Sequence, residues 1–127
     1  MSIDVVVPEA NRKTYQTMQF APAVRSGDFI FCSGCVGTGE SVEEEFRSAW
    51  KQIEQILSEA GADLTDIVDT TIYLVDLQKN AEAMFKVKSE FIQEPYPAST
   101  WIGTTELVIP GARAEIKVIA QRPGISS

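Results

Sequence analysis

Pro95 to Ala120, PYPASTWIGTTELVIPGARAEIKVIA, decides the fold, because it predicts a strand, a turn and a second strand. Successive side chains of a strand alternate between its two faces. In the second strand Glu115 therefore shares a face with Lys117 and Ile119, and the other face carries Ala114, Ile116, Val118 and Ala120. An ionised carboxylate is costly to desolvate without a partner. Glu115 is thus either solvated or structurally paired on a sheet face, or held among apolar neighbours for a function.

Two amphipathic helices are predicted upstream of this segment. Ser41 and Glu44 have the spacing of a capping box, and apolar residues then recur at three- and four-residue steps as far as Gly61. Such a stripe usually covers a sheet, and a cofactor-binding face is the rarer alternative. We expect Asn80 to cap the second helix, which ends before Pro95. Its apolar stripe is Ala83, Met84, Val87 and Phe91.

Short β-branched segments predict the remaining strands: residues 3–7, two strands within 18–34 joined by a tight turn at Gly27, and a central strand at 67–75. Residues 9–17 are polar and predict a loop, and the glycines of residues 34–39 predict a flexible one. The order β, ββ, α, β, α, ββ indicates an α+β domain with both helices on one face of a mixed sheet. The opposite face then needs a cover.

Composition narrows the function. A chain of 127 residues argues for a single domain, residues 1–127. Its net charge of −7, with acids and bases interspersed, offers no basic stripe for nucleic acid. Histidine is absent, which argues against the common zinc sites and histidine-activated nucleophiles, so no metal is expected. Neither a long apolar run nor a signal-peptide pattern at Met1-Ser2-Ile3-Asp4 is seen, so we expect a cytoplasmic protein without membrane contact.

Cys32 and Cys35 form a C-x-x-C pair in or at the end of a predicted strand. Positions three apart on a strand point to opposite faces about 10 Å apart, so a disulfide would require a tight turn at Ser33-Gly34. Two reduced thiols in a cytosolic core are the favoured interpretation, and a redox motif is the alternative.

Two blocks of the sequence form recognisable motifs: residues 23–34, AVRSGDFIFCSG, and a frame made of Pro97-Ala98, Leu107, Pro110 and residues 115–120. On these motifs the chain resembles the RidA/YjgF family, formerly called endoribonuclease L-PSP-like, over nearly its whole length. The first block matches the family's A-V-R-x-G-D-x-I-F-x-S-G segment, and the second reproduces its P-A-R-S, L-P and V-E-I-x-A-I-A frame. The resemblance implies the chorismate-mutase-like fold and a homotrimer in which sheets pack together and ligand clefts lie between subunits.

The resemblance also implies chemistry. Enzymes of the founding branch hydrolyse imines and enamines of 2-amino acids to 2-keto acids and release ammonia, with no metal or organic cofactor. An arginine after P-A grips the substrate carboxylate as a planar fork. In this chain Ser99 occupies that position, followed by Thr100 and Trp101 in place of small residues. The carboxylate grip is therefore missing.

Other family positions are partly kept. Ser33 and Glu115 match, and they imply a hydrogen-bond donor and a group that orients the attacking water. Phe20 replaces a tyrosine and Lys88 an asparagine. Lys88 would hold an anionic ligand or pair with Glu115, unless its ammonium simply reaches solvent. Trp101 either narrows the cleft toward flat or apolar ligands or belongs to core or interface packing.

Two functions follow from these positions, together with a disfavoured third. The first is a cofactor-free deaminase or hydrolase of small imine- or enamine-type metabolites. The second is a non-catalytic trimer that binds a small metabolite or a partner protein. A nuclease is disfavoured by the charge and by the absence of histidine.

Arg113, a further candidate cation, is expected to begin the last strand facing solvent.

Overall fold

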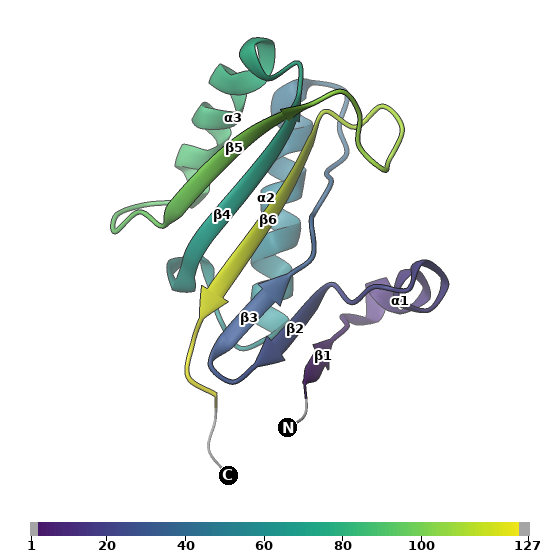
Figure 1. Ribbon diagram of the computed structural model, residues 1–127, viewed down its shortest axis with the longest axis vertical. Coiled ribbons are helices and arrows are strands. Elements are labelled where there is room, and N and C mark those ends of the chain that lie inside the picture. Colours follow the sequence, from purple (N-terminus) through teal and green to yellow (C-terminus); the bar gives the residue numbers. More distant parts are fainter. Residues whose placement is uncertain (1–2, 125–127) are drawn as a thin grey trace.

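A computed structural model describes residues 3–124 of the chain, so Met1 and Ser2 of the N-terminal tetrapeptide lie outside the described residues. It contains one six-stranded mixed sheet (Figure 1). The parallel pair is β4–β5, and the other neighbours are antiparallel. From edge to edge the strands are β1 (Asp4–Val6), β2 (Ala23–Ser26), β3 (Phe29–Cys32), β6 (Ala114–Gln121), β4 (Ile67–Val75) and β5 (Ala98–Thr104).

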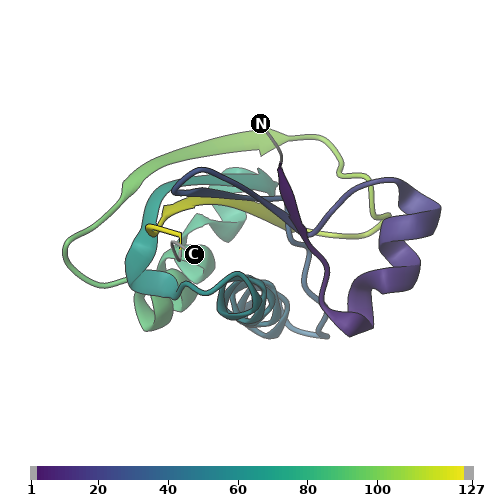
Figure 2. The ribbon, with the colours of Figure 1, turned by 90° about the horizontal axis from the view of Figure 1, so that it is seen from below.

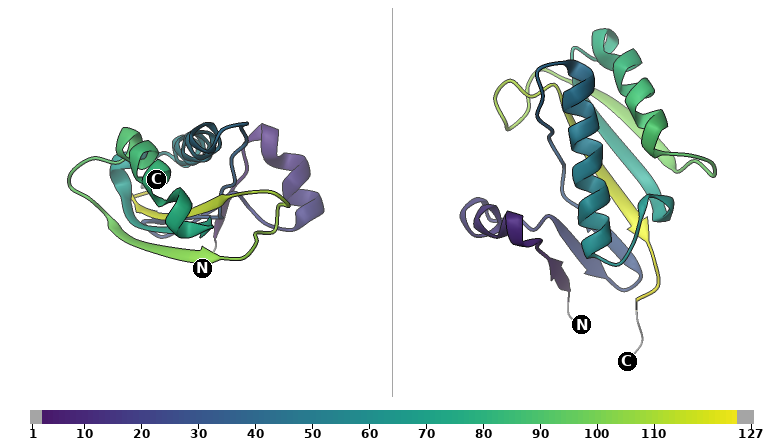
Figure 3. Two further views of the ribbon diagram at one scale, coloured as in Figure 1. Left: turned by 90° about the horizontal axis from the view of Figure 1, so that it is seen from above. Right: turned by 180° about the vertical axis from the view of Figure 1, so that it is seen from behind.

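Two long helices, α2 (Val42–Glu59) and α3 (Leu77–Phe91), cover the same face of the sheet (Figures 2 and 3). The predicted capping box begins α2: the Glu44 N–H donates to Ser41 Oγ at 3.1 Å, and the Ser41 N–H to Glu44 Oε1 at 3.3 Å. Beneath α2 and α3 lies the core, which is built from Phe46, Trp50, Ile53, Leu57, Met84, Ile72, Ile116 and Val118. The predicted α+β class, with both helices on one face, is confirmed.

The prediction of a loop at residues 9–17 is wrong. A 3₁₀ turn, η1 (Glu9–Asn11), leads into the helix α1 (Arg12–Met18). Gln19 ends this helix in the left-handed conformation, with φ 61°. The sequence of this helix lacks the apolar stripe that marks a core helix, and the helix accordingly buries none of its residues completely.

The predicted cap of the second helix is also wrong, and the sheet has one irregularity on the core side. Asp76, not Asn80, precedes the first residue of α3, and Asn80 is buried within the helix, where its Nδ2 donates to the Val75 carbonyl at 2.7 Å. In β4 the pairing register shifts between Ile67 and Asp69. This bulge turns Ile67 toward the core and leaves Val68 exposed, the reverse of the simple alternation.

The two cysteines are free and buried. Burial raises the pKa of the Cys32 thiol to about 12 and that of the Cys35 thiol to about 12. Because the thiolate is the reactive form, these are inert core side chains rather than a redox pair.

Within residues 3–124, no helix of comparable length lies on the face of the sheet opposite α2 and α3 (Figure 2). Phe29 and Phe31 of β3 point to this face and are 40% and 43% exposed, with their ring centroids 6.4 Å apart. Val24 pairs with Phe31 on one side and Ile119 pairs with it on the other. The predicted open sheet face is therefore present and apolar over β2, β3 and β6.

Candidate functional site

A cavity of about 510 Å³ lies beside the open face. Its walls come from α1 and the residues after it, from residues 33–38, from one side of α2 and from the loop that precedes β6. Three of the predicted site residues, Phe20, Ser33 and Glu115, line it together. We call this set the acid half-site.

Glu115 is half-buried on the face away from the helices, as the alternation predicted. Its carboxylate lies directly against the backbone of Gly34: a Cβ added at that glycine would lie 2.2 Å from Glu115 Oε2. The backbone next to Gly34 is held against β6 by two hydrogen bonds. The Cys35 N–H donates to the Ile116 carbonyl at 2.8 Å, and the Ile116 N–H donates to the Cys35 carbonyl at 3.0 Å. The glycine is therefore required for the position of the acid, not for flexibility.

Two hydrogen bonds, one from the backbone and one from the side chain, fix the orientation of Ser33. Its N–H donates to the Pro22 carbonyl at 2.9 Å, and its hydroxyl donates to the Ala21 carbonyl at 2.6 Å. With its proton engaged in this way, the hydroxyl offers a ligand its oxygen lone pairs as acceptors. Phe20 lies at the rim of the cavity, where its ring is 43% exposed.

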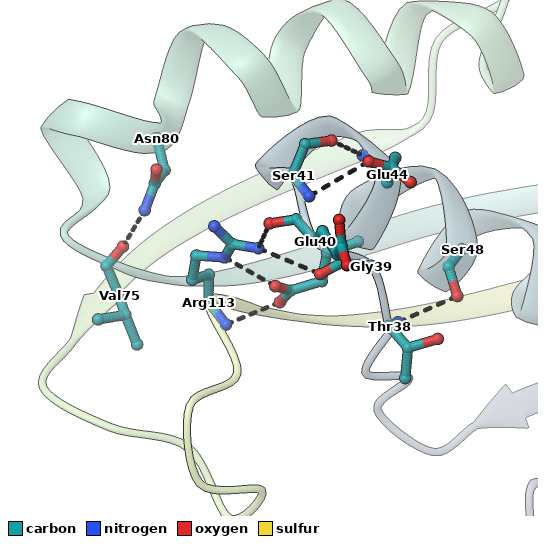
Figure 4. A network of polar contacts seen from close by, with 10 residues as sticks. Thr38, Gly39, Glu40, Ser41, Glu44, Ser48, Val75, Asn80 and Arg113 are labelled. Carbon is teal, nitrogen blue, oxygen red and sulfur yellow. Dashed lines mark hydrogen bonds and ion pairs between the residues drawn. The ribbon is translucent and has the colours of Figure 1, made fainter.

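Arg113 does not face solvent as expected. Its backbone N–H and its Nε each donate to the carboxylate of Glu45 at 2.8 Å, and Glu45 is only 5% exposed (Figure 4). The Arg113 Nη2 also lies 3.5 and 3.4 Å from the carbonyls of Gly39 and Glu40. The Arg113 side chain thus links α2 and residues 39–40 to the start of β6.

The 34–40 segment is consequently held in place and is not the flexible loop that its glycines predicted. The Thr38 N–H donates to Ser48 Oγ at 3.1 Å, and Gln52 Nε2 donates to the Val36 carbonyl at 3.0 Å. A Cβ at Gly37 would meet the Glu45 carbonyl oxygen at 1.9 Å. The sequence did contain a signal for the buried position of Glu45, because this acidic residue lies one turn before Ala49 on the apolar stripe of α2.

Of the predicted residues on β5, Ser99 and Trp101 lie on the far side of the sheet from the acid half-site. Ser99 and Trp101 pair with Thr70 and Ile72 of β4, both fully buried under the helices, so they point to the helix-covered face. Trp101 Nε1 donates to Ser99 Oγ at 3.2 Å, and its ring packs against the core. Thr100 pairs with Thr71 and points to the open face.

Lys88 lies toward the same end of β5 as Ser99. A Cβ at Gly103 would lie 3.4 Å from the Leu77 Cβ, so the first turn of α3 packs on the end of β5. From Leu77 to Lys88 the helix rises roughly 16 Å, and from Gly103 back to Ser99 the strand spans roughly 13 Å in the same direction. Lys88 is half-buried, and burial lowers its pKa. We call Lys88, Ser99 and Trp101 the edge half-site.

Pairing of Lys88 with Glu115 of the same chain is ruled out, because the sheet separates α3 from the face that carries Glu115. Within residues 3–124 no group of three or more His, Cys, Asp and Glu side chains is arranged to hold a metal ion. In the same part of the chain, no helix combines the length and apolar character needed to cross a membrane.

Comparison with known protein families identifies the family of this chain. The family model described as endoribonuclease L-PSP matches residues 11–122. The chain belongs to the YjgF/RidA family. The RutC family protein YjgH of Escherichia coli is 35% identical over 125 residues, which cover 93% of this chain and 94% of that protein. A mite relative from Dermatophagoides farinae, named 2-iminobutanoate/2-iminopropanoate deaminase, is 30% identical and covers 79% of this chain and 83% of its own length.

Solved structures of the YjgF/RidA family have the same fold. Rv2704 of Mycobacterium tuberculosis, a member of the YjgF/YER057c/UK114 family, superposes with a TM-score of 0.85 at 28% identity, covering 94% of this chain and 99% of its own. The resemblance drawn from the sequence motifs is thereby confirmed for the family and for the fold.

Proposed function

We propose that residues 1–127 form a single RidA-like domain that hydrolyses small imine- or enamine-type metabolites without a cofactor, as a homotrimer. The observation that carries the proposal is the half-buried Glu115, set against Gly34 at a ligand-sized cavity that also holds Ser33. The names of the mite deaminase and of other relatives, among them a chloroplast Reactive Intermediate Deaminase A, support the reaction class.

The trimer completes the site. In one chain, the sheet separates the acid half-site from the edge half-site of Lys88, Ser99 and Trp101. A neighbouring chain that covers the apolar open face brings its own edge half-site to the rim of this chain's cavity. The exposed Phe29 and Phe31 support such a cover, since large apolar surfaces seldom stay in water on a stable protein.

The reaction is the addition of water to a C=N bond. The Glu115 carboxylate accepts a proton from water as the oxygen bonds to the imine carbon, and the proton passes to the nitrogen. The C–N bond of the resulting carbinolamine then breaks, so that a ketone remains and ammonia leaves. Net, one imine and one water give one ketone and one ammonia. The Ser33 oxygen accepts a hydrogen bond from the N–H of the substrate.

Charge recognition differs from that of an arginine-bearing site. Ser99 has no charge, and Lys88, which shares its end of β5, is a point charge without the planar fork. We therefore expect weaker selection for 2-imino acids than an arginine provides, with Lys88 contacting the anionic part of a ligand. The same substitution favours a second function, a trimer that binds the metabolite without turning it over.

The test is ammonia or ketone release from imines generated in place by an amino acid oxidase, measured above the uncatalysed rate. We expect activity in the wild type, a loss of about 100-fold in Glu115→Gln and weaker substrate binding in Lys88→Ala. Lys86→Ala is the matched control, because Lys86 is an exposed lysine of the same helix. Sedimentation should give three chains per particle.

An inactive wild type that gains activity only as Ser99→Arg would support the binding protein instead. Wild-type activity that survives Glu115→Gln would refute the assigned role of the acid.

A further inference from the structure

The rim of the cavity is unusually apolar for a surface. Met18, Phe20, Val108 and Ile109 all line it, and each is between 43% and 78% exposed. They come from two separate parts of the chain, the end of α1 and the loop before β6. Clusters of exposed apolar side chains mark binding sites more often than scattered ones do.

The lining of the cavity is mostly apolar, with polar side chains at Asn11, Thr14, Tyr15, Ser33, Thr38 and Gln52. Among its lining residues in the described part of the chain, Glu115 is the charged one. The Ser33 hydroxyl donates to Ala21, and Gln52 Nε2 donates to Val36, so both donors are already engaged. The cavity therefore has one acidic end at Gly34 and Glu115, and its remaining walls, including Ile56, are mostly apolar.

The size of the cavity points the same way. About 510 Å³ lies within the range of roughly 300–1,000 Å³ found for sites that enclose drug-sized ligands. A three-carbon imine at Glu115 would leave much of this space to water against apolar side chains, an arrangement that gains nothing from the hydrophobic effect.

We propose that the substrate carries a branched or aromatic apolar side chain, of leucine or phenylalanine size, which lies against Met18, Phe20, Val108 and Ile109. This inference rests on the proposed function, because it places the C=N group of the substrate at Glu115. The α1 helix, which has no apolar stripe in its sequence, supplies one wall of this side-chain pocket.

The experiment compares imines generated by an amino acid oxidase from alanine, leucine and phenylalanine. Each buried CH₂ is worth about 0.8 kcal/mol, or about fourfold. Leucine has three more carbons than alanine, and the rim is open, so we expect kcat/KM for its imine to be at least tenfold higher. Met18→Ser and Val108→Ser should each reduce this ratio about threefold or more.

Phe85→Ser is the matched control, because Phe85 is 66% exposed on α3 and lies outside the cavity lining. Its leucine-to-alanine ratio should equal that of the wild type. A ratio near one in the wild type, or a high ratio that neither cavity variant lowers, would overturn the inference.

A second measurement separates this inference from the proposed reaction. If no imine is hydrolysed, the reaction is refuted, and titration calorimetry with 4-methyl-2-oxopentanoate and pyruvate still tests the pocket. Tighter binding of the branched acid, lost in Val108→Ser, would support the side-chain pocket. Equal binding of the two acids would refute it.

Discussion

Removal of the Arg113 side chain tests how the candidate site is held together. Arg113→Met keeps most of the apolar stem and deletes the 2.8 Å bond from Nε to Glu45, whose carboxylate is almost fully buried. Breaking a buried ion pair from one side costs about 3–5 kcal/mol. The Arg113 side chain is 31% exposed, and its backbone N–H still reaches the other carboxylate oxygen, so we expect about 2–3 kcal/mol.

The assay is urea unfolding at one fixed protein concentration, with the slope of the transition compared between variants. For a chain of this size the loss corresponds to a melting temperature about 10 °C lower. The variant carrying both Glu45→Met and Arg113→Met should be more stable than the sum of the single losses predicts, by about 1 kcal/mol or more, because it buries no unpaired charge.

The matched control is Arg47→Met. Arg47 also donates twice to a carboxylate, that of Glu90, at 2.8 and 2.6 Å, but the Glu90 side chain is 41% exposed, whereas that of Glu45 is 6% exposed. Water screens such a pair, so the unfolding curve should barely move. Equal losses in Arg47→Met and Arg113→Met, or strictly additive effects in the double variant, would refute the reasoning.

Two further predictions concern Gly34 and the two buried cysteines. Gly34→Ala should leave the fold intact, because the added Cβ meets only the flexible end of Glu115, but the displaced carboxylate should lower any Glu115-dependent activity at least tenfold; a fully active variant would show that the contact is unimportant. Cys32 and Cys35 should resist iodoacetamide at pH 8 until the protein unfolds. Since burial raises both thiol pKa values to about 12, they stabilise the fold fully below pH 9, and this contribution should be lost as the pH rises from 9 toward 12.

Much of the architecture follows from local patterns. The strand alternation correctly assigned Ile116 and Val118 to the core and Glu115 to the other face. The capping box and apolar stripe located α2, because an amphipathic helix must bury one side. Patterns of this kind are repeated along the chain and do not depend on distant residues. The family resemblance agreed with them over the same segments.

Other features escaped this reasoning because they depend on partners far away in sequence. The α1 helix has no apolar stripe, and Asn80 satisfies a carbonyl at the end of β4 instead of capping a helix. Arg113 was expected in solvent because its partner, Glu45, lies on another element. The signal available in the sequence was an acidic residue, Glu45, on the apolar stripe of α2. That signal does not show which basic residue pairs with the acid.

The sequence by itself determined the period of each major strand and helix and the face on which Glu115 lies. Those properties are local, since backbone geometry converts spacing into direction. Only the tertiary structure separated the candidate residues into an acid half-site and an edge half-site on opposite sides of one sheet. That separation depends on strand order and crossover, which bring together or divide side chains whatever their distance along the chain.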